Sequence, residues 1–351
     1  KVSVGLGRIF NSFRILVNMI WSHKTYKNIT KDINDFNPDI IHFHSLMPFL
    51  SISALVAAKN NKVPVIQTLH NMRWLCVEGG FYRNGKFCND CSKTLGVRGA
   101  IRGCSRGRFV SSLIFIINYF ARTNMRLFSW VHSFVAVSDY VKDTYVDSGF
   151  PSEQVFVKHN AIDLPLIASE KFKKGIAFAG RVSVAKGSDV IRKLIPFINE
   201  EIHIIGVGPE LKSLKLFCHQ GGHDHVTFWG KLSREDTLEI LSKVSCTVVP
   251  SQCGETFSLV AAESMGVGTP VVASNLGGVA QIVDKAKGGV LVSPDDIDGF
   301  IFNITNILDD TATAKLLGMN GKLFVKENLS SIAMAKKLLW IYENAILGDR
   351  V

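Results

Sequence analysis

Two glutamates eight residues apart, Glu255 and Glu263, have the spacing that most directly suggests chemistry in this sequence. A turn and then an apolar run that favours a helix lie between them, and residues 246–250 before them have the pattern of a short buried strand. A strand–loop–helix unit of this kind places the unpaired amides of a helix N-terminus at the carboxyl end of a sheet, where they can bind phosphate. Ionised carboxylates in the same place can accept hydrogen bonds from sugar hydroxyls.

Two basic residues follow another predicted strand further up the chain. Arg181 comes directly after the predicted strand 174–179 and Gly180, and Lys186 lies five residues later, at the start of a helical pattern. Cations on a loop at the end of a strand are suited to binding a diphosphate. We therefore expect a phosphate site formed by Arg181, Lys186 and the helix that begins near residue 257.

Five short motifs occur in a fixed order. They are Gly180-Arg181, Lys186-Gly187, Gly206-Val-Gly208-Pro209, Glu255-x7-Glu263 and Gly277-Gly278. Together they resemble the C-terminal half of a family 4 glycosyltransferase with the GT-B fold, of the type found in bacterial surface-polysaccharide synthesis. This resemblance implies an α/β protein in which two Rossmann-like domains face a central cleft. It also implies transfer of a hexosyl-type sugar from a UDP- or GDP-sugar to a saccharide or lipid-linked acceptor, with retention of configuration and no cofactor for catalysis.

The resemblance assigns roles to individual residues. Arg181 and Lys186 would neutralise the leaving diphosphate, Glu255 would hold the sugar hydroxyls, and Glu263 would bind the ribose diol. The implied nucleotide-sugar site comprises Gly180, Arg181, Lys186, Gly208, Thr256, Phe257, Ser258, Leu259 and Glu263. No side chain is an obvious general base, which suits a front-face displacement in which the leaving phosphate takes the acceptor proton. A GT-B sugar-nucleotide epimerase and a non-catalytic GT-B scaffold remain as alternatives.

His70 is the candidate catalytic residue of the N-terminal half. It ends the predicted strand 63–70, where active-site loops emerge from a parallel sheet. The resemblance also places a histidine at this point, in contact with the donor sugar. His42 and His44 lie on an earlier strand, and their alternation is equally consistent with packing.

The domain boundaries can be placed from the same patterns. We expect an N-terminal acceptor-side domain over residues 1–165, a nucleotide-sugar-binding domain over residues 172–331, and a helix over residues 332–351 that crosses back to the first domain. The chain opens without the strand and Gly-Gly turn that the family normally carries. We therefore expect that part of the first domain lies outside this sequence.

Composition and charge narrow the choice of compartment and partners. With 47% hydrophobic and 20% charged residues, the 351-residue chain is not disordered, and its length suits two domains. Seven irregularly spaced cysteines without a signal peptide favour a reducing, cytoplasmic location. Residues 1–163 contain 20 Lys and Arg against 10 Asp and Glu, whereas the remainder is balanced, so the excess of ten positive charges lies in the N-terminal half. No recognised nucleic-acid-binding motif accompanies this charge.

Two apolar and basic segments, residues 8–21 and 108–122, could contact a membrane. The second has 13 residues without charge, fewer than the roughly 20 that a spanning helix needs. Such helices can instead lie on the anionic inner leaflet, with Phe10, Phe13, Ile20 or Trp21 inserted. The alternatives are ordinary buried helices, or a basic surface that binds a soluble anionic acceptor.

Four cysteines lie in a basic loop between residues 76 and 108. Cys88 and Cys91 form a Cys-x2-Cys pair, and Cys76 and Cys104 flank it. Four thiolates can complete a tetrahedral structural zinc site, and a loop of this length needs a stabilising link. Because the second pair lacks the Cys-x2-Cys spacing, reduced thiols or one redox-active pair are equally open.

Overall fold

The structure is a computed structural model that describes residues 21–44, 46, 51–105, 107–123, 127–164 and 174–348. The chain divides into two compact units. Unit 1 comprises Lys1–Gly79, Asn89–Lys158 and Lys336–Val351, and unit 2 comprises Gly80–Cys88 and His159–Ala335. The division at residues 158 and 159 falls a few residues before the boundary expected at 165, and it runs through the C-terminal helix rather than before it.

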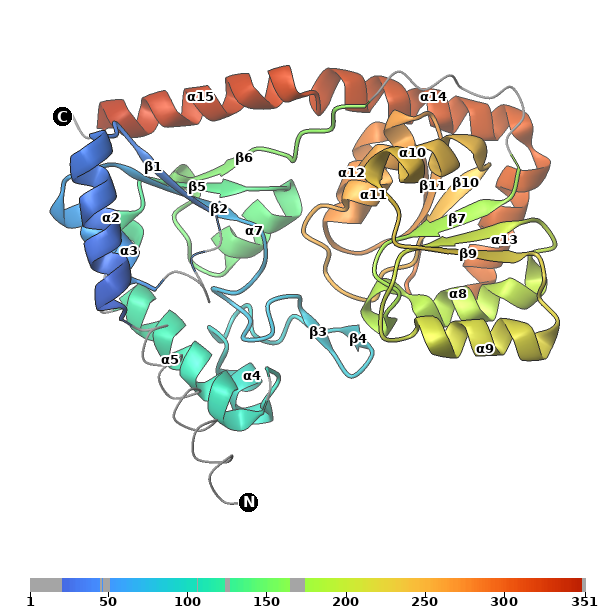
Figure 1. Ribbon diagram of the computed structural model, residues 1–351, viewed down its shortest axis with the longest axis horizontal. Helices are drawn as coiled ribbons and strands as arrows, with labels where there is room; N and C mark the ends of the chain where they lie inside the picture. The colour runs from blue at the N-terminus through green and yellow to red at the C-terminus, as the bar shows by residue number, and fades with distance from the viewer. Residues whose placement is uncertain are drawn as a thin grey trace. The chain divides into compact units, whose positions relative to one another are not determined.

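Unit 1 is built on a four-stranded parallel sheet in the order β1-β2-β5-β6 (Figure 1). Its strands are β1 (Ile41–His44), β2 (Val65–Leu69), β5 (Ser133–Ala136) and β6 (Val155–Val157). Its helices are α2 (His23–Phe36), α3 (Ser53–Asn60), α4 (Val97–Arg102), α5 (Arg108–Thr123), α6 (Leu127–Trp130) and α7 (Asp139–Asp147). Every residue of β2 and β5 is buried, as expected for strands of a parallel sheet that is covered on both faces.

Unit 2 is built on a six-stranded parallel sheet in the order β12-β11-β10-β7-β8-β9 (Figure 1). The strands are β7 (Ile176–Ala179), β8 (Ile202–Ile205), β9 (Val226–Gly230), β10 (Cys246–Val249), β11 (Val271–Ser274) and β12 (Gly289–Val292). The helices are α8 (Ser188–Leu194), α9 (Leu211–Gly221), α10 (Arg234–Lys243), α11 (Leu259–Gly266), α12 (Gly277–Ala286), α13 (Ile297–Asp309) and α14 (Thr311–Asn328). Short 3-10 turns (Ser152–Gln154, Val184–Lys186, Ile195–Phe197) and the hairpin β3 (Tyr82–Arg83) and β4 (Lys86–Phe87) complete the two units.

Helices cover both faces of the unit 2 sheet, as alternating side chains of β7 show. Ile176 and Phe178 belong to a core cluster with residues of α8, α9 and α13. Ala177, which points the other way, packs with Leu238 and Leu241 of α10. Successive strand residues face opposite sides of a sheet, so these two clusters are the two hydrophobic layers of one doubly wound domain. The predicted α/β class with two parallel-sheet domains is confirmed.

The last helix, α15 (Ser331–Gly348), corresponds to the helix expected over residues 332–351. From Lys336 onward it belongs to unit 1. There Ile341 and Ala345 pack against Ile66 and Val135 of the sheet, and the Trp340 ring contacts Phe156 edge-on at 5.5 Å. The C-terminal segment is therefore part of the unit 1 core.

The helix predicted from residues 108–122 has an unusual distribution of polarity. The face of α5 toward the protein includes Ser111 and Asn118, whereas Phe109, Ile116 and Phe120 are 69%, 55% and 46% exposed. Positions 109, 113, 116 and 120 are spaced by four, three and four residues, so they form one stripe along the helix.

Arg122 does not flank this apolar stripe as the sequence suggested. It lies largely inside unit 1, where it donates to the Ser148 carbonyl at 2.7 Å and stacks over Phe150 at 4.9 Å, and burial lowers its pKa to about 10. Phe10, Phe13, Ile20 and Arg106, with the rest of the segment 8–20, lie outside the described residues. In the part of the chain that the structure describes, no helix is both long enough and apolar enough to cross a membrane.

Candidate active site

The order of strands in unit 2 brings the predicted basic loop and the first glutamate together. β7 lies between β10 and β8. After β7 the chain adds β8 and β9 on one edge, and it then adds β10, β11 and β12 on the opposite edge. Ligands of doubly wound folds bind at such a point, just beyond the carboxyl ends of the two central strands. The loops after β7 and β10 carry Lys186 and Glu255, and Lys186 Nζ lies 2.8 Å from Glu255 Oε1.

Glu255 is held firmly in this loop. Its side chain is 8% exposed, and its Oε1 accepts a short hydrogen bond from the Ser251 hydroxyl in addition to the ion pair. Gly187, at φ +86°, makes the close approach possible, because a Cβ there would lie 2.0 Å from the Pro250 carbonyl oxygen. A carboxylate this deeply placed requires such partners, since desolvation of an unpaired charge is costly.

The N-terminus of α11 lies where the sequence predicted a phosphate-binding element. Its N-cap residue, Ser258, has φ +75° and makes no side-chain capping hydrogen bond. No described residue accepts from the amides of Leu259, Val260 and Ala261, which are the first three of the helix. A strained non-glycine residue before an uncapped helix is typical of ligand-binding loops, and uncapped amides attract anions.

Glu263 lies in the second turn of α11. Its side chain is 13% exposed, and its Oε1 accepts from Arg234 Nε at 2.6 Å. Arg234 is the first residue of α10. Glu255 and Glu263 are thus both paired with cations.

The other predicted donor-site residues lie on the same two loops and their neighbours. Arg181 is exposed, and Gly180 has φ +137°. Gly208 packs so closely that a Cβ would lie 2.1 Å from the Val182 carbonyl oxygen, so the loops after β7 and β8 are in contact. Thr256 is half-buried, Phe257 is buried beside the His159 ring at 5.8 Å, and Leu259 is half-exposed.

Neighbouring strands of unit 1 place three histidines in a row. His44 ends β1 and His70 follows β2, and because these strands pair in parallel their carboxyl ends meet. His44 Nδ1 lies 2.8 Å from His70 Nε2. His42 stacks on His44 at 4.3 Å between ring centroids and shares hydrogen bonds of 2.7 Å with Tyr342 Oη and Thr68 Oγ1.

The histidines favour their neutral form. Burial and the nearby positive charge of Lys158 lower the pKa of His44, and burial, His44 and Lys158 lower that of His70. For His42, burial followed by His44, Lys158 and His70 lowers the pKa to about 4. The His44–His70 hydrogen bond requires one ring to donate and the other to accept, so at least one of the pair is neutral. His42 and His44 thus belong to one polar network with His70 rather than to the packing that their alternation alone would explain.

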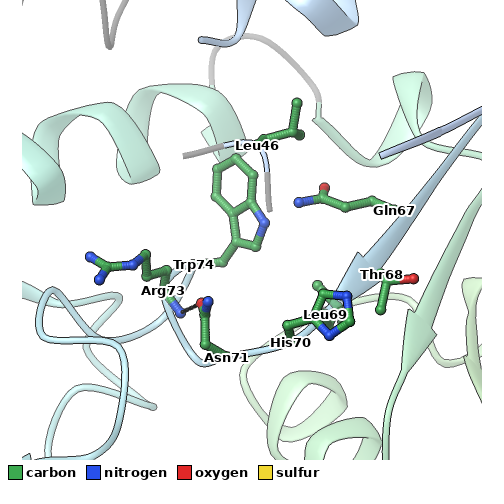
Figure 2. Close-up of a pocket in the computed structure, with 8 residues that line it drawn as sticks. All are labelled: Leu46, Gln67, Thr68, Leu69, His70, Asn71, Arg73 and Trp74. Carbon is green, nitrogen blue, oxygen red and sulfur yellow. Dashed lines mark hydrogen bonds between the residues drawn. The ribbon is translucent and has the colours of Figure 1, made fainter. Parts of the chain in front are cut away.

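A pocket opens beside His70. With the solvent space at its mouth it has a volume of about 320 Å³, and it is lined by Leu46, Gln67, Thr68, Leu69, His70, Asn71, Arg73 and Trp74. Figure 2 shows the Gln67 amide pointing toward the Trp74 indole. Gln67 is 3% exposed, and its Oε1 accepts no hydrogen bond from any residue that the structure describes. A buried carbonyl without a donor is costly, so the pocket offers a ready acceptor to a ligand hydroxyl or a water.

The four cysteines are not gathered as the predicted zinc site requires. Cys76 and Cys91 contact each other, and this thiol hydrogen bond, with burial, raises the pKa of Cys91 above its usual range. Cys88, by contrast, belongs to unit 2. Across the described ranges, which include all four thiols, no three His, Cys, Asp or Glu side chains are arranged to hold a metal ion.

The sequence did not identify several residues of these sites. Ser251, Arg234 and Gln67 carry no motif. Ser251 contacts Glu255 four residues away and Arg234 contacts Glu263 29 residues away, whereas the Gln67 pocket joins Leu46 to the segment that follows β2. The Ser251–Glu255 contact lies in the loop between β10 and α11, where a four-residue spacing does not predict contact. The Arg234–Glu263 pair could not be predicted either, because it depends on how α10 packs beside α11.

Comparisons with known protein families identify the class of protein to which this fold belongs. Residues 173–310 match the model described as "Glycosyl transferases group 1", and residues 5–165 match the model "Glycosyltransferase Family 4". The chain belongs to glycosyltransferase family 4, and it is a retaining glycosyltransferase with the GT-B fold.

Individual relatives support this placement. An uncharacterized glycosyltransferase of Methanocaldococcus jannaschii, MJ1178, is 26% identical over 338 residues, which cover 96% of this chain and 80% of that protein. A D-inositol 3-phosphate glycosyltransferase of Mycobacterium marinum is 31% identical over 150 residues, 41% of this chain and 32% of that protein. Anabaena HepE in complex with UDP and glucose is similar in structure, with a TM-score of 0.69 and 16% identity over 90% of this chain and 80% of that one.

Proposed function

We propose that this glycosyltransferase moves a hexosyl-type sugar from a UDP- or GDP-sugar to a saccharide or lipid-linked acceptor. The observation that carries the proposal is the arrangement in unit 2, where Lys186, Glu255 and the uncapped N-terminus of α11 meet beyond the carboxyl ends of β7 and β10. A cation and helix amides suit a diphosphate, and a buried carboxylate beside them suits sugar hydroxyls. The complex of HepE with UDP and glucose supports a uridine donor as the first to be tested.

The proposed roles follow from this placement. Lys186 and the exposed Arg181 stabilise the charge that grows on the leaving diphosphate, and the amides of residues 259–261 add the stabilisation of a helix N-terminus. Glu255 orients the donor sugar through its hydroxyls, and Glu263 binds the ribose diol. The leaving phosphate takes the acceptor proton. None of these steps requires a metal ion.

On the acceptor side, we assign His70 a contact with the donor sugar, following the resemblance, and the adjoining pocket a contact with the acceptor. Gln67 Oε1 supports the second assignment, because an acceptor hydroxyl would supply the hydrogen bond that this buried oxygen lacks. The lowered pKa values of His44 and His70 keep this network neutral, which suits an uncharged sugar.

We also propose that the enzyme works in the cytoplasm at the inner face of the membrane, where a lipid-linked acceptor would be found. The outward stripe of α5 supports this, because Phe109, Ile116 and Phe120 are exposed although Ile114, Ile117 and Ala121 already form the apolar part of its buried side. The positive charge of the N-terminal half would attract anionic lipids, at about 1 kcal/mol for each Lys or Arg near the surface. Arg122 is half-buried and bound to the Ser148 carbonyl and the Phe150 ring, so we do not count it toward this attraction.

A panel of UDP-, GDP- and other nucleotide sugars tests the donor assignment. A donor that binds the folded protein raises its unfolding temperature, and the stabilisation grows with the ratio of ligand concentration to Kd. The nucleotide sugar that stabilises the protein is then incubated with candidate acceptors, and the anomeric configuration of the product is determined by NMR. Absence of stabilisation by every nucleotide sugar at millimolar concentration would contradict the proposed function.

A further inference from the structure

Arg234 begins α10 at a position that does not favour its charge. It directly follows the N-cap Ser233, and the N-terminal end of a helix carries partial positive charge that stabilises acids rather than cations. Glu235 and Asp236, in the same turn, obey this preference. A cation here therefore depends on a partner outside its own helix, and Glu263 Oε1 lies 2.6 Å from Arg234 Nε.

Glu263 depends equally on Arg234. Its carboxylate is 13% exposed, and among the described residues no other group donates a hydrogen bond to it. The guanidinium occupies Oε1, which leaves Oε2 to accept from a ligand. The Arg234 side chain is 43% exposed, so its charge also reaches the solvent-facing side of the carboxylate.

We propose that Arg234 is a positioning residue for donor recognition: it holds the Glu263 carboxylate so that Oε2 receives the ribose diol of the nucleotide. The proposal rests on the proposed function, in which Glu263 binds the ribose. A carboxylate fixed through one oxygen presents the other in a single orientation, which a freely rotating Glu would not. The Arg234 charge also offsets the repulsion between Glu263 and the diphosphate, whose negative charges would otherwise face an unpaired carboxylate.

A purely structural role for Arg234 makes a different prediction. Asp163 has a lowered pKa because Ser331 donates hydrogen bonds to it and, to a smaller extent, because Arg234 is close. If Arg234 served mainly to hold this linker residue, then Asp163→Asn would have the same consequences as loss of Arg234. This substitution is therefore the matched control.

The test compares nucleotides that differ only in the ribose hydroxyls. Isothermal titration calorimetry with UDP and GDP identifies the nucleotide that binds, and the 2′,3′-dideoxy form of that nucleotide is titrated next. The dideoxy form lacks the hydroxyls that would donate to the charged Glu263, so the wild-type enzyme should bind it about 10- to 100-fold more weakly than the nucleotide. For Arg234→Ala we expect this ratio to fall below about threefold, with the nucleotide itself bound about tenfold more weakly. Arg234→Lys should give intermediate values, since it keeps the charge but not the Nε geometry.

Each outcome has a defined meaning. Asp163→Asn should keep the wild-type ratio, and Arg234→Ala combined with Glu263→Gln should be no weaker than Glu263→Gln alone, because the two residues act together. A wild-type ratio in Arg234→Ala, or the same collapse in Asp163→Asn, would overturn the role of Arg234. Failure of the wild-type enzyme to bind any nucleotide would instead refute the proposed function, and this inference with it. Thermal unfolding verifies folding, and Arg234→Gln replaces the alanine variant if that one is unstable.

Discussion

Replacing Lys186 by alanine should weaken nucleoside diphosphates far more than nucleosides. Lys186 supplies the cation beside Glu255 at 2.8 Å, and a hydrogen bond to a charged group contributes about 1.5–3 kcal/mol. The lost phosphate contact alone would therefore weaken UDP or GDP by about 10- to 100-fold. Glu255, 8% exposed, would also lose its positive partner and would then repel the diphosphate, so the effect should lie toward the upper end. Uridine or guanosine, which has no phosphate, should change by less than about threefold.

Calorimetry with each nucleotide and its nucleoside measures both quantities on the same protein. Lys287→Ala is the control, because Lys287 forms an exposed ion pair with Asp284 on α12, at 71% and 64% side-chain exposure. It should leave both affinities unchanged. An equal loss of affinity for nucleotide and nucleoside in Lys186→Ala would show that Lys186 shapes the site without contacting phosphate, and it would refute the reasoning.

Three further outcomes are expected. Glu255→Gln should lower turnover by about 10²-fold or more. UDP or GDP should bind at least as well, because Lys186 would no longer be paired with the Glu255 carboxylate and would be free to pair with phosphate. Wild-type turnover in this variant would show that Glu255 is not part of the site. The triple variant Phe109→Ser, Ile116→Ser, Phe120→Ser should no longer co-sediment with anionic vesicles at low salt. The control variant Leu316→Ser, Met319→Ser, Leu323→Ser, which removes a comparably exposed stripe of α14, should still co-sediment. The membrane proposal would be contradicted if the wild-type protein did not bind the vesicles, or if both variants lost binding equally. The wild-type protein should lose stability as the pH falls from about 6.5 toward 4, because the folded state holds the His42 pKa at about 4 and binds fewer protons than the unfolded chain over that range; His42→Gln should lose less, as measured by thermal unfolding at each pH.

The sequence predicted the donor site better than the acceptor side, for a physical reason. Strand ends, glycine turns and the Glu255–Glu263 spacing are local patterns, and the order of parallel strands converts them into proximity. Strands expected over residues 174–179 and 246–250 correspond to β7 and β10. The assignment of roles to these residues remains a prediction.

Features that depend on packing between distant segments were not predictable. The pair of His44 and His70 requires β1 and β2 to be neighbours in a fixed register, and the burial of Arg122 requires the Phe150 ring beneath it. The predicted zinc site failed for a similar reason, since four cysteines near one another in sequence were placed in different units. The sequence does not show that Cys76 and Cys91 contact each other while Cys88 belongs to the other unit.

The close backbone contacts of unit 2 limit how this enzyme can diversify. At Gly187 a Cβ would lie 2.0 Å from the Pro250 carbonyl oxygen, and at Gly278 it would lie 2.4 Å from that of Thr256. The spacing of the loops after β7, β10 and β11 is therefore set by main-chain atoms, which cannot move aside as the end of a side chain can. Selection for a new donor sugar should consequently accept no replacement at either glycine. Accepted changes should gather at side chains that border the site, such as Thr256, so that the donor sugar can change while the phosphate-binding loops stay the same.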